Sequence, residues 1–502
     1  MVVARWRSCA ASCRQRGMNP AGQATLEDTR ARVTALLRRH GWNATSPQVL
    51  EGGFSYWFDG DDACVAYVDT GGAWVAAGAP LASDATRSEV AARFVAEARA
   101  RGRRACFFAT ELRFVRETLR DAPALGDVPT RGSSATGSRR DAATPSEAVL
   151  TSMQMGEQPV WDPRTWETSL RASRSLREQL RRARAKGVTI RAVPPAEAAD
   201  PHTALGAAVG ELARQWTEGR GMAPMGFLVQ IELSTFPEER LCFVAEREGV
   251  LVGLLAAVPV YARNGWLIED LLRHPDAPNG SVELLVDAAM RHLAQVGSDF
   301  ATLGLAPLSG DISPWLRAAR RLGAGLYDFH GLHAFKAKLR PHAWVPIFLS
   351  FPERQGSLVT TLDVLRAFAS GGLVRFGLRT ILRAPGIVIR LMALLLVPWT
   401  LLLASPPAAP YFPSAAVRAA WVAFDVLVAA GLFALMQRYR RPLAVLLASA
   451  VTADALLTLA QAVVYNAPRA HGLIDHLVMV SAVAAPSAAA LLLWQAIRRA
   501  RL

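Results

Sequence analysis

The sequence predicts an α+β fold followed by a bundle of membrane-spanning helices. Two observations lead to this prediction. The first 350 residues alternate short apolar strands with amphipathic helices, as a water-soluble mixed protein does. After Leu391 almost every residue is apolar, which helps raise the hydrophobic fraction of the 502-residue chain to 51%. A chain of this length is expected to form two or three domains.

Charge and cysteine content narrow the class of protein. The formal net charge of +14 comes mainly from arginine, which suits anionic partners such as phospholipid or RNA. A preference for arginine in a GC-rich genome explains the charge equally well. The five cysteines are scattered and show no metal-ligand spacing, so we expect a reducing cytosol and no metal site. The start, "MVVARWRSCAASCRQRG", lacks the apolar region of a secretory signal, and we expect residues 1–24 to be disordered.

The first domain is expected over residues 25–120. A basic amphipathic helix (Thr25–Gly41) leads into the segments "FSYWF" and "ACVAYVDTGGAWVAAGAPL", which read as alternating strands around a Gly-Gly turn. A helix (Arg87–Arg101) and a strand, "RACFFAT", follow. The next stretch is rich in Pro, Gly, Ser and Thr and has no periodicity, which predicts a linker or insertion over 121–165.

A second domain is expected over residues 166–350. It opens with a strongly basic helix (Ser169–Gly187), followed by the strand "VTIRAV" and a helix near His202–Glu218. The hairpin "RLCFVAEREGVLVGLLAAVPVY" turns at Glu248-Gly249, and the strand "GWLIEDLLR" follows it. A helix (Ser281–Val296), the strand "FATLGLAPL" and a helix (Ser313–Leu322) complete the order. This is the order of a GNAT-type acyltransferase fold, and the first domain repeats a shorter version, so we expect tandem GNAT-like domains.

The loop "RHPDAPNG" before the Ser281 helix bears on the ligand. GNAT enzymes that use CoA hold its pyrophosphate with backbone N–H groups at this place. Here Pro275 and Pro278 lack an N–H, Asp276 would repel phosphate, and Asn279-Gly280 predicts a turn before Ser281, which can cap the helix. The segment "RRLGAG" has CoA-motif letters but ends a helix, so Gly at a helix C-terminus is the better interpretation. We therefore expect neither CoA nor another cofactor.

The C-terminal part is expected to span a membrane four times. A basic amphipathic connector over 351–390 precedes a membrane domain over 391–502, with spans at Leu391–Ala409, Ala415–Met436, Pro442–Tyr465 and Leu473–Ile497. Arginines gather before the first span, between the second and third, and after the fourth. By the positive-inside rule both termini and the preceding domains are cytoplasmic. The location expected is a bacterial inner membrane.

Three segments resemble one known family. "DLLRHPDAPNGSVELL", "LGLAPLSG" and "LYDFHGLHAFKAKLRPHAWVPIFLS" are similar to the C-terminal catalytic domain of bacterial phosphatidylglycerol lysyltransferases, the multiple peptide resistance factor family. The resemblance covers about Ala31–Pro352 apart from the linker. It implies transfer of an aminoacyl group, lysyl or alanyl, from aminoacyl-tRNA to a hydroxyl of phosphatidylglycerol, which alters surface charge and resistance to cationic peptides. Family members usually carry a larger membrane region before the catalytic domain, whereas here it is smaller and follows.

Candidate site residues cluster around the loop. We expect Asp270, Arg273 and Lys336 to be catalytic: Asp270 to orient the amino group or the attacking hydroxyl, and the two cations to meet phosphate or the oxyanion. Lys336 and Lys338 in "FKAKL" are expected on one side of a strand. Substrate binding is further assigned to the following residues: Glu269, Asp276, Asn279, Gly280, Ser281, Lys338, Arg177, Arg181 and Arg184. For each, a solvated surface position or a turn former is the alternative.

Two further hypotheses remain open. The acceptor is another lipid, such as diacylglycerol, or a peptidoglycan precursor; or the chain is a non-catalytic, membrane-anchored RNA- or lipid-binding protein. Within the membrane domain, Asp425 and Asp454 lie near the middle of their spans, where an acid is costly. We expect this polar pair either to join the helices by hydrogen bonds or to accept the cationic headgroup of the product.

Overall fold

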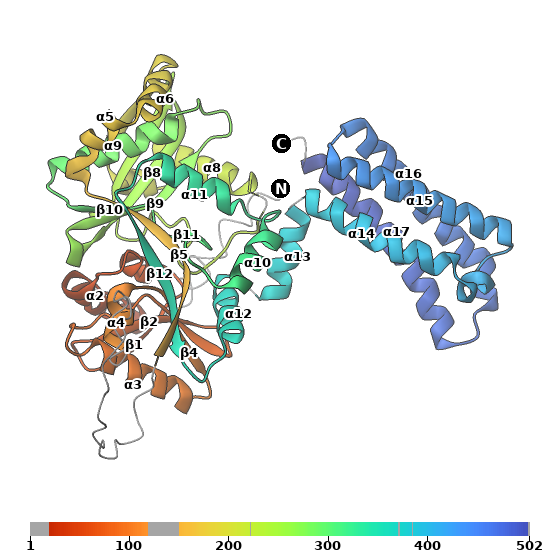
Figure 1. Ribbon diagram of the computed structural model, residues 1–502, viewed down its shortest axis with the longest axis horizontal. Helices are drawn as coiled ribbons and strands as arrows, with labels where there is room; N and C mark the ends of the chain where they lie inside the picture. The colour runs from red at the N-terminus through yellow and green to blue at the C-terminus, as the bar shows by residue number, and fades with distance from the viewer. Residues whose placement is uncertain (1–19, 119–149, 221, 370–371, 384, 500–502) are drawn as a thin grey trace, which may run out of the picture. The chain divides into compact units, whose positions relative to one another are not determined.

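The computed structural model describes residues 20–118, 150–220, 222–369, 372–383 and 385–499 (Figure 1). The chain divides into two compact units. The sheet unit comprises Met1–Glu218, Pro224–Leu322 and Asp328–Ser370, and the helical unit comprises Gly219–Ala223, Gly323–Tyr327 and Gly371–Leu502. Most of the segment expected to be disordered at the N-terminus lies outside the described residues, but a helix already begins at Pro20.

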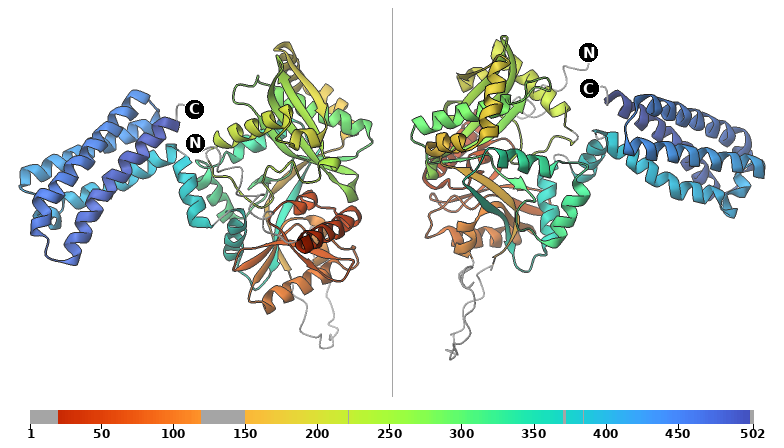
Figure 2. Two further views of the ribbon diagram at one scale, coloured as in Figure 1. Left: turned by 180° about the vertical axis from the view of Figure 1, so that it is seen from behind. Right: turned by 45° about the horizontal axis from the view of Figure 1, so that its top comes forward.

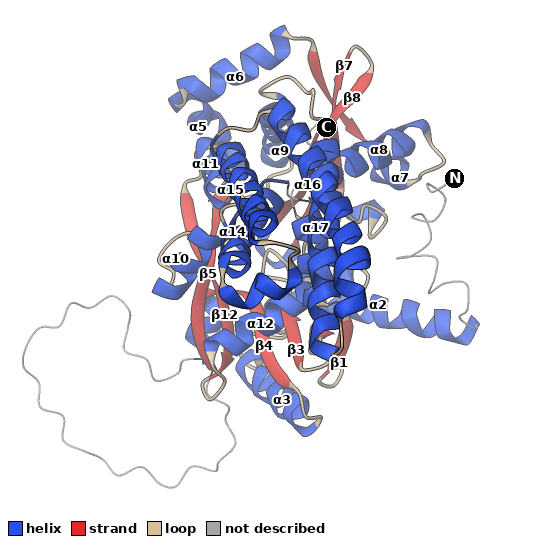
Figure 3. Ribbon diagram, turned by 90° about the vertical axis from the view of Figure 1, so that its right-hand side faces the viewer, coloured by secondary structure: helices blue, strands red, loops and turns tan. Residues whose placement is uncertain are grey.

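One mixed sheet of twelve strands forms the framework of the sheet unit (Figure 3). The strand order is β1-β2-β3-β4-β12-β5-β10-β9-β8-β7-β6, with β11 paired to β5. The strands are β1 (Ser55–Phe58), β2 (Cys64–Asp69), β3 (Ala73–Ala77), β4 (Arg104–Glu111), β5 (Leu150–Trp161), β6 (Val188–Val193), β7 (Leu241–Arg247), β8 (Val250–Val260), β9 (Gly265–Arg273), β10 (Phe300–Thr302), β11 (Ala306–Pro307) and β12 (Ala343–Pro352).

The first half of the sheet, β1 to β4, matches the prediction closely. β1, β2 and β3 pair antiparallel, and β4 joins β3 in parallel after the crossover helix α3 (Arg87–Ala100). Alternate residues of β3 face opposite sides: Trp74 packs with Phe94 of α3, while Val75 shares a core with Val33 of α2 (Pro20–His40). Two short helices complete this half, η2 (Ser46–Leu50) and α4 (Leu112–Thr118).

The second half repeats the same order of pairing. β6, β7, β8 and β9 are antiparallel, and β10 joins β9 in parallel after the crossover helix α9 (Ser281–Gln295). α9 covers one face of these strands, and α8 (Ala204–Glu218) packs on the other (Figures 1 and 2). An antiparallel set closed by one parallel pair, present twice, is the tandem GNAT-like arrangement predicted from the order of elements.

Helices around the second half differ from the prediction in detail. The basic helix predicted over 169–187 is two helices, α5 (Trp166–Ala172) and α6 (Arg174–Ala185), because Ser173 leaves the helical conformation and its hydroxyl caps α6. The remaining helices are α7 (Pro195–Ala199), α10 (Pro314–Gly323) and α11 (Phe329–Lys338). The "RRLGAG" segment lies at the C-terminal end of α10, as the capping interpretation predicts.

Two long strands at the centre of the sheet were not predicted from the sequence. β5 lies inside the segment assigned to a linker over 121–165, so that assignment is wrong from Leu150 onward; residues 119–149 lie outside the described residues. β12 pairs with β4 of the first half on one side and with β5 along its whole length on the other. Hydrogen bonding therefore runs without a break from the first half into the second.

A bulge and a divergence of strands shape the middle of β9. Ala256 of β8 pairs with Asp270 and Ala257 with Ile268, so Glu269 is an extra residue on β9. On its other side β9 pairs with β10 only from Gly265 to Leu267. Among the described residues, no strand pairs with the second part of β9 on the β10 side. Bulges at such places re-aim side chains and occur beside active sites.

The helical unit contains long apolar helices. Three of them are long and apolar enough to cross a membrane: Ala415–Gln437 (α15), Arg441–Arg469 (α16, Arg441–Gln461, with its continuation) and Leu473–Arg498 (within α17, Leu473–Arg499). The first predicted span corresponds to α14 (Pro385–Ala404), whose apolar part, Val388–Ala404, is shorter. α14 to α17 share one core. The connector predicted over 351–390 contains α12 (Ser357–Phe368), which belongs to the sheet unit, and α13 (Leu373–Arg383).

Candidate functional site

Three buried carboxyl groups and one arginine meet at the bulge of β9. We call Glu51, Glu269, Asp270 and Arg240 the buried acid cluster. Glu51 and Asp270 are 3% and 6% exposed. Arg240 Nη1 and Glu269 Oε2 lie 2.6 Å apart, with side chains 2% and 4% exposed. Three buried acids thus face a single compensating cation.

The four members of the cluster come from three separate pieces of chain. Glu51 ends η2 of the first half, and Gln48 in that turn donates a hydrogen bond to the carbonyl of Leu228. Arg240 precedes β7, and its Nε donates to the carbonyl of Thr235 at 2.7 Å. The bulge in β9 supplies the two adjacent acids. The cluster therefore forms only when both halves of the sheet unit are folded together.

The acids have more acceptor oxygens than donors to satisfy them. Glu51 Oε1 and Oε2, Glu269 Oε1 and Asp270 Oδ2 are buried and have no hydrogen-bond partner in the described structure. Burial and the neighbouring Glu269 raise the pKa of Glu51 well above its usual value. The same two causes raise the pKa of Asp270 to about 8, against the opposing effect of Arg240. Because carboxylates offer only acceptors, contact between them requires a shared proton or an added cation.

The loop between β9 and α9 is built differently from the prediction at its end. Gly280, not Ser281, is the N-cap of α9; it has φ of 99°, and a side chain there would meet the backbone of Gln179 in α6. Ser281 instead donates from its hydroxyl to the carbonyl of Pro278. Asp276 and Asn279 are exposed turn residues. The loop therefore packs against the basic helix α6.

Arg273 ends β9 with its side chain exposed. Its Nη2 donates to the carbonyl of Ala277 at 3.2 Å, and no acid partners it in the described structure. The guanidinium keeps most of its donors for an external anion such as phosphate. Asp270 is buried three residues earlier, so the two predicted catalytic residues are neighbours on one strand without a direct hydrogen bond.

Lys336 has a different environment from the predicted one. The "FKAKL" segment is the end of α11 and not a strand, because Asp328 caps that helix by accepting from the N–H of Gly331. Lys336 is 5% exposed, and its Nζ donates to the carbonyls of Leu303, Gly304 and Leu305 at 2.8, 2.9 and 2.9 Å. Burial lowers its pKa to about 7, whereas the three carbonyls favour the ammonium form. All three of its protons are used, so the geometry assigns Lys336 to holding the chain after β10.

Lys338 is also engaged. Its Nζ lies 2.6 Å from Glu283 Oε1 in α9, and the two side chains are 33% and 8% exposed. The strand interpretation of Lys336 and Lys338 as one cationic face is therefore wrong: one lysine supports the wall beside β10, and the other ties α11 to α9.

The arginines of α6 are partly neutralised. Arg181 and Arg182 pair with Glu178, Arg184 pairs with the buried Asp287 of α9, and Arg177 donates to the carbonyls of Leu170 and Arg171. For Arg171, Arg174 and Lys186 no acidic partner appears among the described residues. A cationic surface remains on α5 and α6, next to the loop at Gly280.

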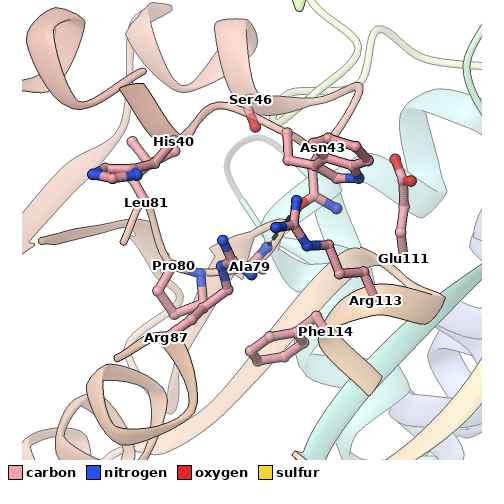
Figure 4. Close-up of a pocket in the computed structure, with 11 residues that line it drawn as sticks. His40, Asn43, Ser46, Ala79, Pro80, Leu81, Arg87, Glu111, Arg113 and Phe114 are labelled. Atoms are coloured by element: carbon pink, nitrogen blue, oxygen red, sulfur yellow. Dashed lines mark hydrogen bonds between the residues drawn. The ribbon is translucent and has the colours of Figure 1, made fainter. Parts of the chain in front are cut away.

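A shallow pocket in the first half is a poor candidate site (Figure 4). Its volume is about 290 Å³ including open solvent, and its polar lining includes Asn43, Arg87 and Arg113. Arg87 pairs with Asp84 and Glu117, and Arg113 pairs with Asp84 as well. These cations are already neutralised, so the pocket offers no free charge to a ligand.

Asp425 and Asp454 are brought together in the helical unit. Asp425 in α15 is 5% exposed, and its Oδ2 has no partner in the described structure. Asp454 in α16 lies within electrostatic range of it and contacts the hydroxyl of Thr458. The sequence places both acids near the middle of their helices, and their proximity in the structure is consistent with this.

Two members of the buried acid cluster were not found from the sequence. Glu51 precedes Gly52-Gly53 and looks like a turn residue, and Arg240 looks like a charge before a strand. Only a contact between the two halves reveals them. Among the described residues no group of three or more His, Cys, Asp or Glu is arranged to hold a metal ion.

Comparison with known proteins gives one family match over most of the sheet unit. The model of the family described as phosphatidylglycerol lysyltransferase, C-terminal, matches residues 34–351. That range contains every member of the buried acid cluster, the loop before α9 and both strands that join the halves.

Curated relatives resemble the same region. The lysylphosphatidylglycerol biosynthesis bifunctional protein LysX of Rhodococcus opacus is 27% identical over 257 residues, which is 46% of this chain and 22% of the relative. The protein of that name from Mycobacterium tuberculosis is 24% identical over 251 residues, 47% of this chain and 21% of the relative. The matched region thus spans about a fifth of the length of these relatives.

Two solved structures share the fold. The C-terminal domain of a lysylphosphatidylglycerol synthetase from Agrobacterium fabrum has a TM-score of 0.55 at 21% identity, covering 69% of this chain and 98% of that one. L-PGS from Bacillus licheniformis has a TM-score of 0.53 at 20% identity, covering 70% and 97%.

Proposed function

The chain belongs to the family of phosphatidylglycerol lysyltransferase C-terminal domains, and on that premise we propose that it transfers an aminoacyl group, lysyl or alanyl, from aminoacyl-tRNA to a hydroxyl of phosphatidylglycerol. The reaction exchanges one ester for another. The carbonyl carbon gains a bond to the lipid oxygen and loses its bond to the tRNA ribose oxygen, and the proton of the lipid hydroxyl passes to that ribose oxygen.

One observation carries the proposal: the unpaired oxygens of the buried acid cluster. An aminoacyl group differs from most acyl groups in carrying an ammonium, which has three N–H donors and one positive charge. Glu51, Glu269 and Asp270 together present four unpartnered oxygens, and only Arg240 offsets their charge. The three N–H donors of an ammonium entering the cluster would serve three of these four oxygens.

The position of the cluster fits this role. It lies where β9 diverges from β10, the place at which a GNAT fold receives its acyl group. The chain from Pro224 to Arg240, between α8 and β7, contains only the three-residue helix η4 (Pro237–Glu239). This is the segment whose displacement would admit the aminoacyl end of a tRNA. An irregular segment of this length is commonly functional.

Phosphate groups of the two substrates would meet the cations around the loop. Arg273 is exposed at the end of β9 and suits a phosphate of either substrate. The N-terminus of α9 adds a favourable dipole for an anion. The basic surface of α5 and α6 adjoins the loop and suits the phosphates of the tRNA acceptor stem.

We further propose that the helical unit anchors the protein in a membrane, with the sheet unit on the cytoplasmic side. Three apolar helices support the anchor, and the arginines at 438, 440, 441 and 498 support the orientation. Both substrates would then be within reach, because aminoacyl-tRNA is cytosolic and the lipid lies in the inner leaflet.

The test is transfer by the purified full-length protein in nanodiscs that contain phosphatidylglycerol. Aminoacyl-tRNAs carrying labelled lysine, alanine or other residues are supplied singly, and the lipid phase is analysed by mass spectrometry. We expect aminoacyl-phosphatidylglycerol from at least one donor, and Glu51→Gln to reduce its formation. If no donor yields a modified lipid while the protein stays folded, the proposal is wrong. If diacylglycerol alone becomes aminoacylated, then diacylglycerol and not phosphatidylglycerol is the acceptor.

A further inference from the structure

Helix α12 presents an apolar face that nothing in the described structure covers. Four of the eight large apolar side chains that are well exposed in the sheet unit lie on this one helix. Leu358, Val359, Leu362 and Leu365 are 60%, 44%, 46% and 48% exposed. At 100° per residue, Leu358, Leu362 and Leu365 fall within one narrow stripe.

The opposite face of α12 is firmly fixed to the sheet. Asp363 is fully buried and accepts two hydrogen bonds from Arg104 of β4, at 2.7 and 2.8 Å. Val364 and Ala367 join the core of the first half, and the ring of Phe368 lies edge-on against Phe108. The helix therefore cannot turn its apolar stripe inward without breaking a buried ion pair. The packing of α12 on the sheet therefore fixes the outward direction of the apolar stripe.

Position in the chain indicates what covers the stripe. α12 starts at Ser357, shortly after the end of the family match at residue 351. The apolar helices of the helical unit follow within about thirty residues. Arg366 borders the stripe with its side chain 45% exposed. Its Nη1 lies 3.1 Å from Asp363 Oδ1, and the exposed part of the guanidinium suits an anionic headgroup.

We propose that α12 lies in the interface of the bilayer, with Leu358, Leu362 and Leu365 in the acyl region and Arg366 at the headgroups. The helix would hold the sheet unit against the membrane that contains its lipid substrate. The inference rests on the membrane anchor proposed above and not on aminoacyl transfer.

The test locates α12 in proteoliposomes made from phosphatidylglycerol and phosphatidylethanolamine with the full-length protein. A fluorescent label is placed at Leu358→Cys in a background in which Cys9 and Cys13 are serine; the described cysteines, Cys64, Cys106 and Cys242, are buried. Val250→Cys is the matched control, because Val250 is 64% exposed in the same unit but begins strand β8 and belongs to no apolar helix stripe. Quenchers are a spin-labelled lipid and aqueous iodide.

We expect the spin-labelled lipid to quench the label at 358 at least about twofold more than the label at 250, and iodide to show the reverse. Leu362→Glu should abolish the difference, whereas Thr361→Glu, on the flank of the same helix, should leave it. Equal iodide quenching at both positions would overturn the proposal. So would a label at 358 that neither quencher reaches, since a second protein molecule would then cover the stripe. Because no aminoacyl-tRNA is supplied, no transfer can occur, and the outcome is independent of catalysis.

Discussion

Arg240 Nη1 and Glu269 Oε2 form an ion pair of 2.6 Å that is almost completely shielded from water. The pair satisfies one carboxylate and leaves Glu51 and Asp270 beside it without a cation of their own. Removing one partner of a buried pair leaves an isolated charge. We proposed above that the ammonium of the aminoacyl group binds beside this pair.

Neutralising either surplus acid should impair transfer while keeping the fold. We expect Glu51→Gln and Asp270→Asn each to lower kcat/KM for the aminoacyl-tRNA by about 10- to 100-fold, because each removes one acceptor for the ammonium. Initial rates at varied donor concentration measure the effect. Glu246→Gln is the control, since Glu246 pairs with Arg191 on the surface of the same sheet. Wild-type rates in both cluster variants would mean that the ammonium binds elsewhere.

Stability should depend on pH through Asp270. The folded pKa of about 8 lies above the unfolded value of about 3.9, so the folded state binds more protons between these pH values. This contribution to stability is complete below pH 4 and is lost as pH rises through 8. Asp270→Asn should therefore remove part of the loss between pH 5 and pH 8, worth about 2–4 °C in Tm. If the Tm of the wild type and of the variant changed equally with pH, Asp270 would not be the source of this pH dependence.

Lys336 should prove structural. Lys336→Met leaves the carbonyls of Leu303, Gly304 and Leu305 without their donor, and we expect a loss of about 2–4 kcal/mol in the free energy of unfolding. Denaturant unfolding of the detergent-solubilised protein measures it. Lys186→Met, at an exposed end of α6, is the matched control and should change little. A folded, equally stable Lys336→Met protein without activity would instead return Lys336 to catalysis.

The cations of α5 and α6 should govern tRNA affinity. Reversing Arg177, Arg181 and Arg184 to Glu should weaken aminoacyl-tRNA binding and lower the slope of log K against log salt by up to about three. Arg184 contacts the buried Asp287, so reversal there endangers folding. Arg171→Glu with Arg174→Glu avoids this risk and should lower the slope by up to about two. Arg214→Glu on α8 serves as the control. If the variants and the wild type bound aminoacyl-tRNA with equal affinity at low salt, the surface of α5 and α6 would not be a tRNA-binding site.

Asp425 and Asp454 should affect transport rather than synthesis, if they receive the cationic headgroup. Asp425→Asn with Asp454→Asn should leave total aminoacyl lipid unchanged and lower the fraction that an impermeant amine reagent labels on intact cells. The physical reason is that amides cannot offset an ammonium at the depth of the helices. An unchanged labelled fraction would identify the two acids as contacts between α15 and α16.

Local signals in the sequence predicted most elements of the fold. The hairpin at Glu248-Gly249, the helix α9 and the order of elements follow from periodicity and turn residues, which depend on neighbours in the chain. β5 was missed because its twelve residues, "LTSMQMGEQPVW", mix polar side chains with Gly and Pro. Such a sequence becomes a strand only through its neighbours, β12 along its whole length and β10.

Only part of the site was predicted, because sequence patterns report on residues that are close together in the chain. Asp270, Glu269 and Arg273 stand at a strand end before a stiff loop, and sequence spacing reveals that. Glu51 lies more than 200 residues away, and no local pattern connects it with Asp270. Lys336 was assigned to a strand because "FKAKL" alternates, although Leu332, Phe335 and Leu339 fit a helix equally well. Short apolar segments permit both readings, and tertiary packing decides between them.

β12 has a consequence for how this architecture can change over time. The last strand of the sheet unit inserts between β4 of the first half and β5 of the second, so each half completes its sheet with hydrogen bonds from a strand encoded near the end. Neither half is therefore an exchangeable module. A recombination event that replaced residues before β5 would also need a compatible β12, some two hundred residues downstream. The two halves are bound to be inherited together, whatever helices a lineage adds after them.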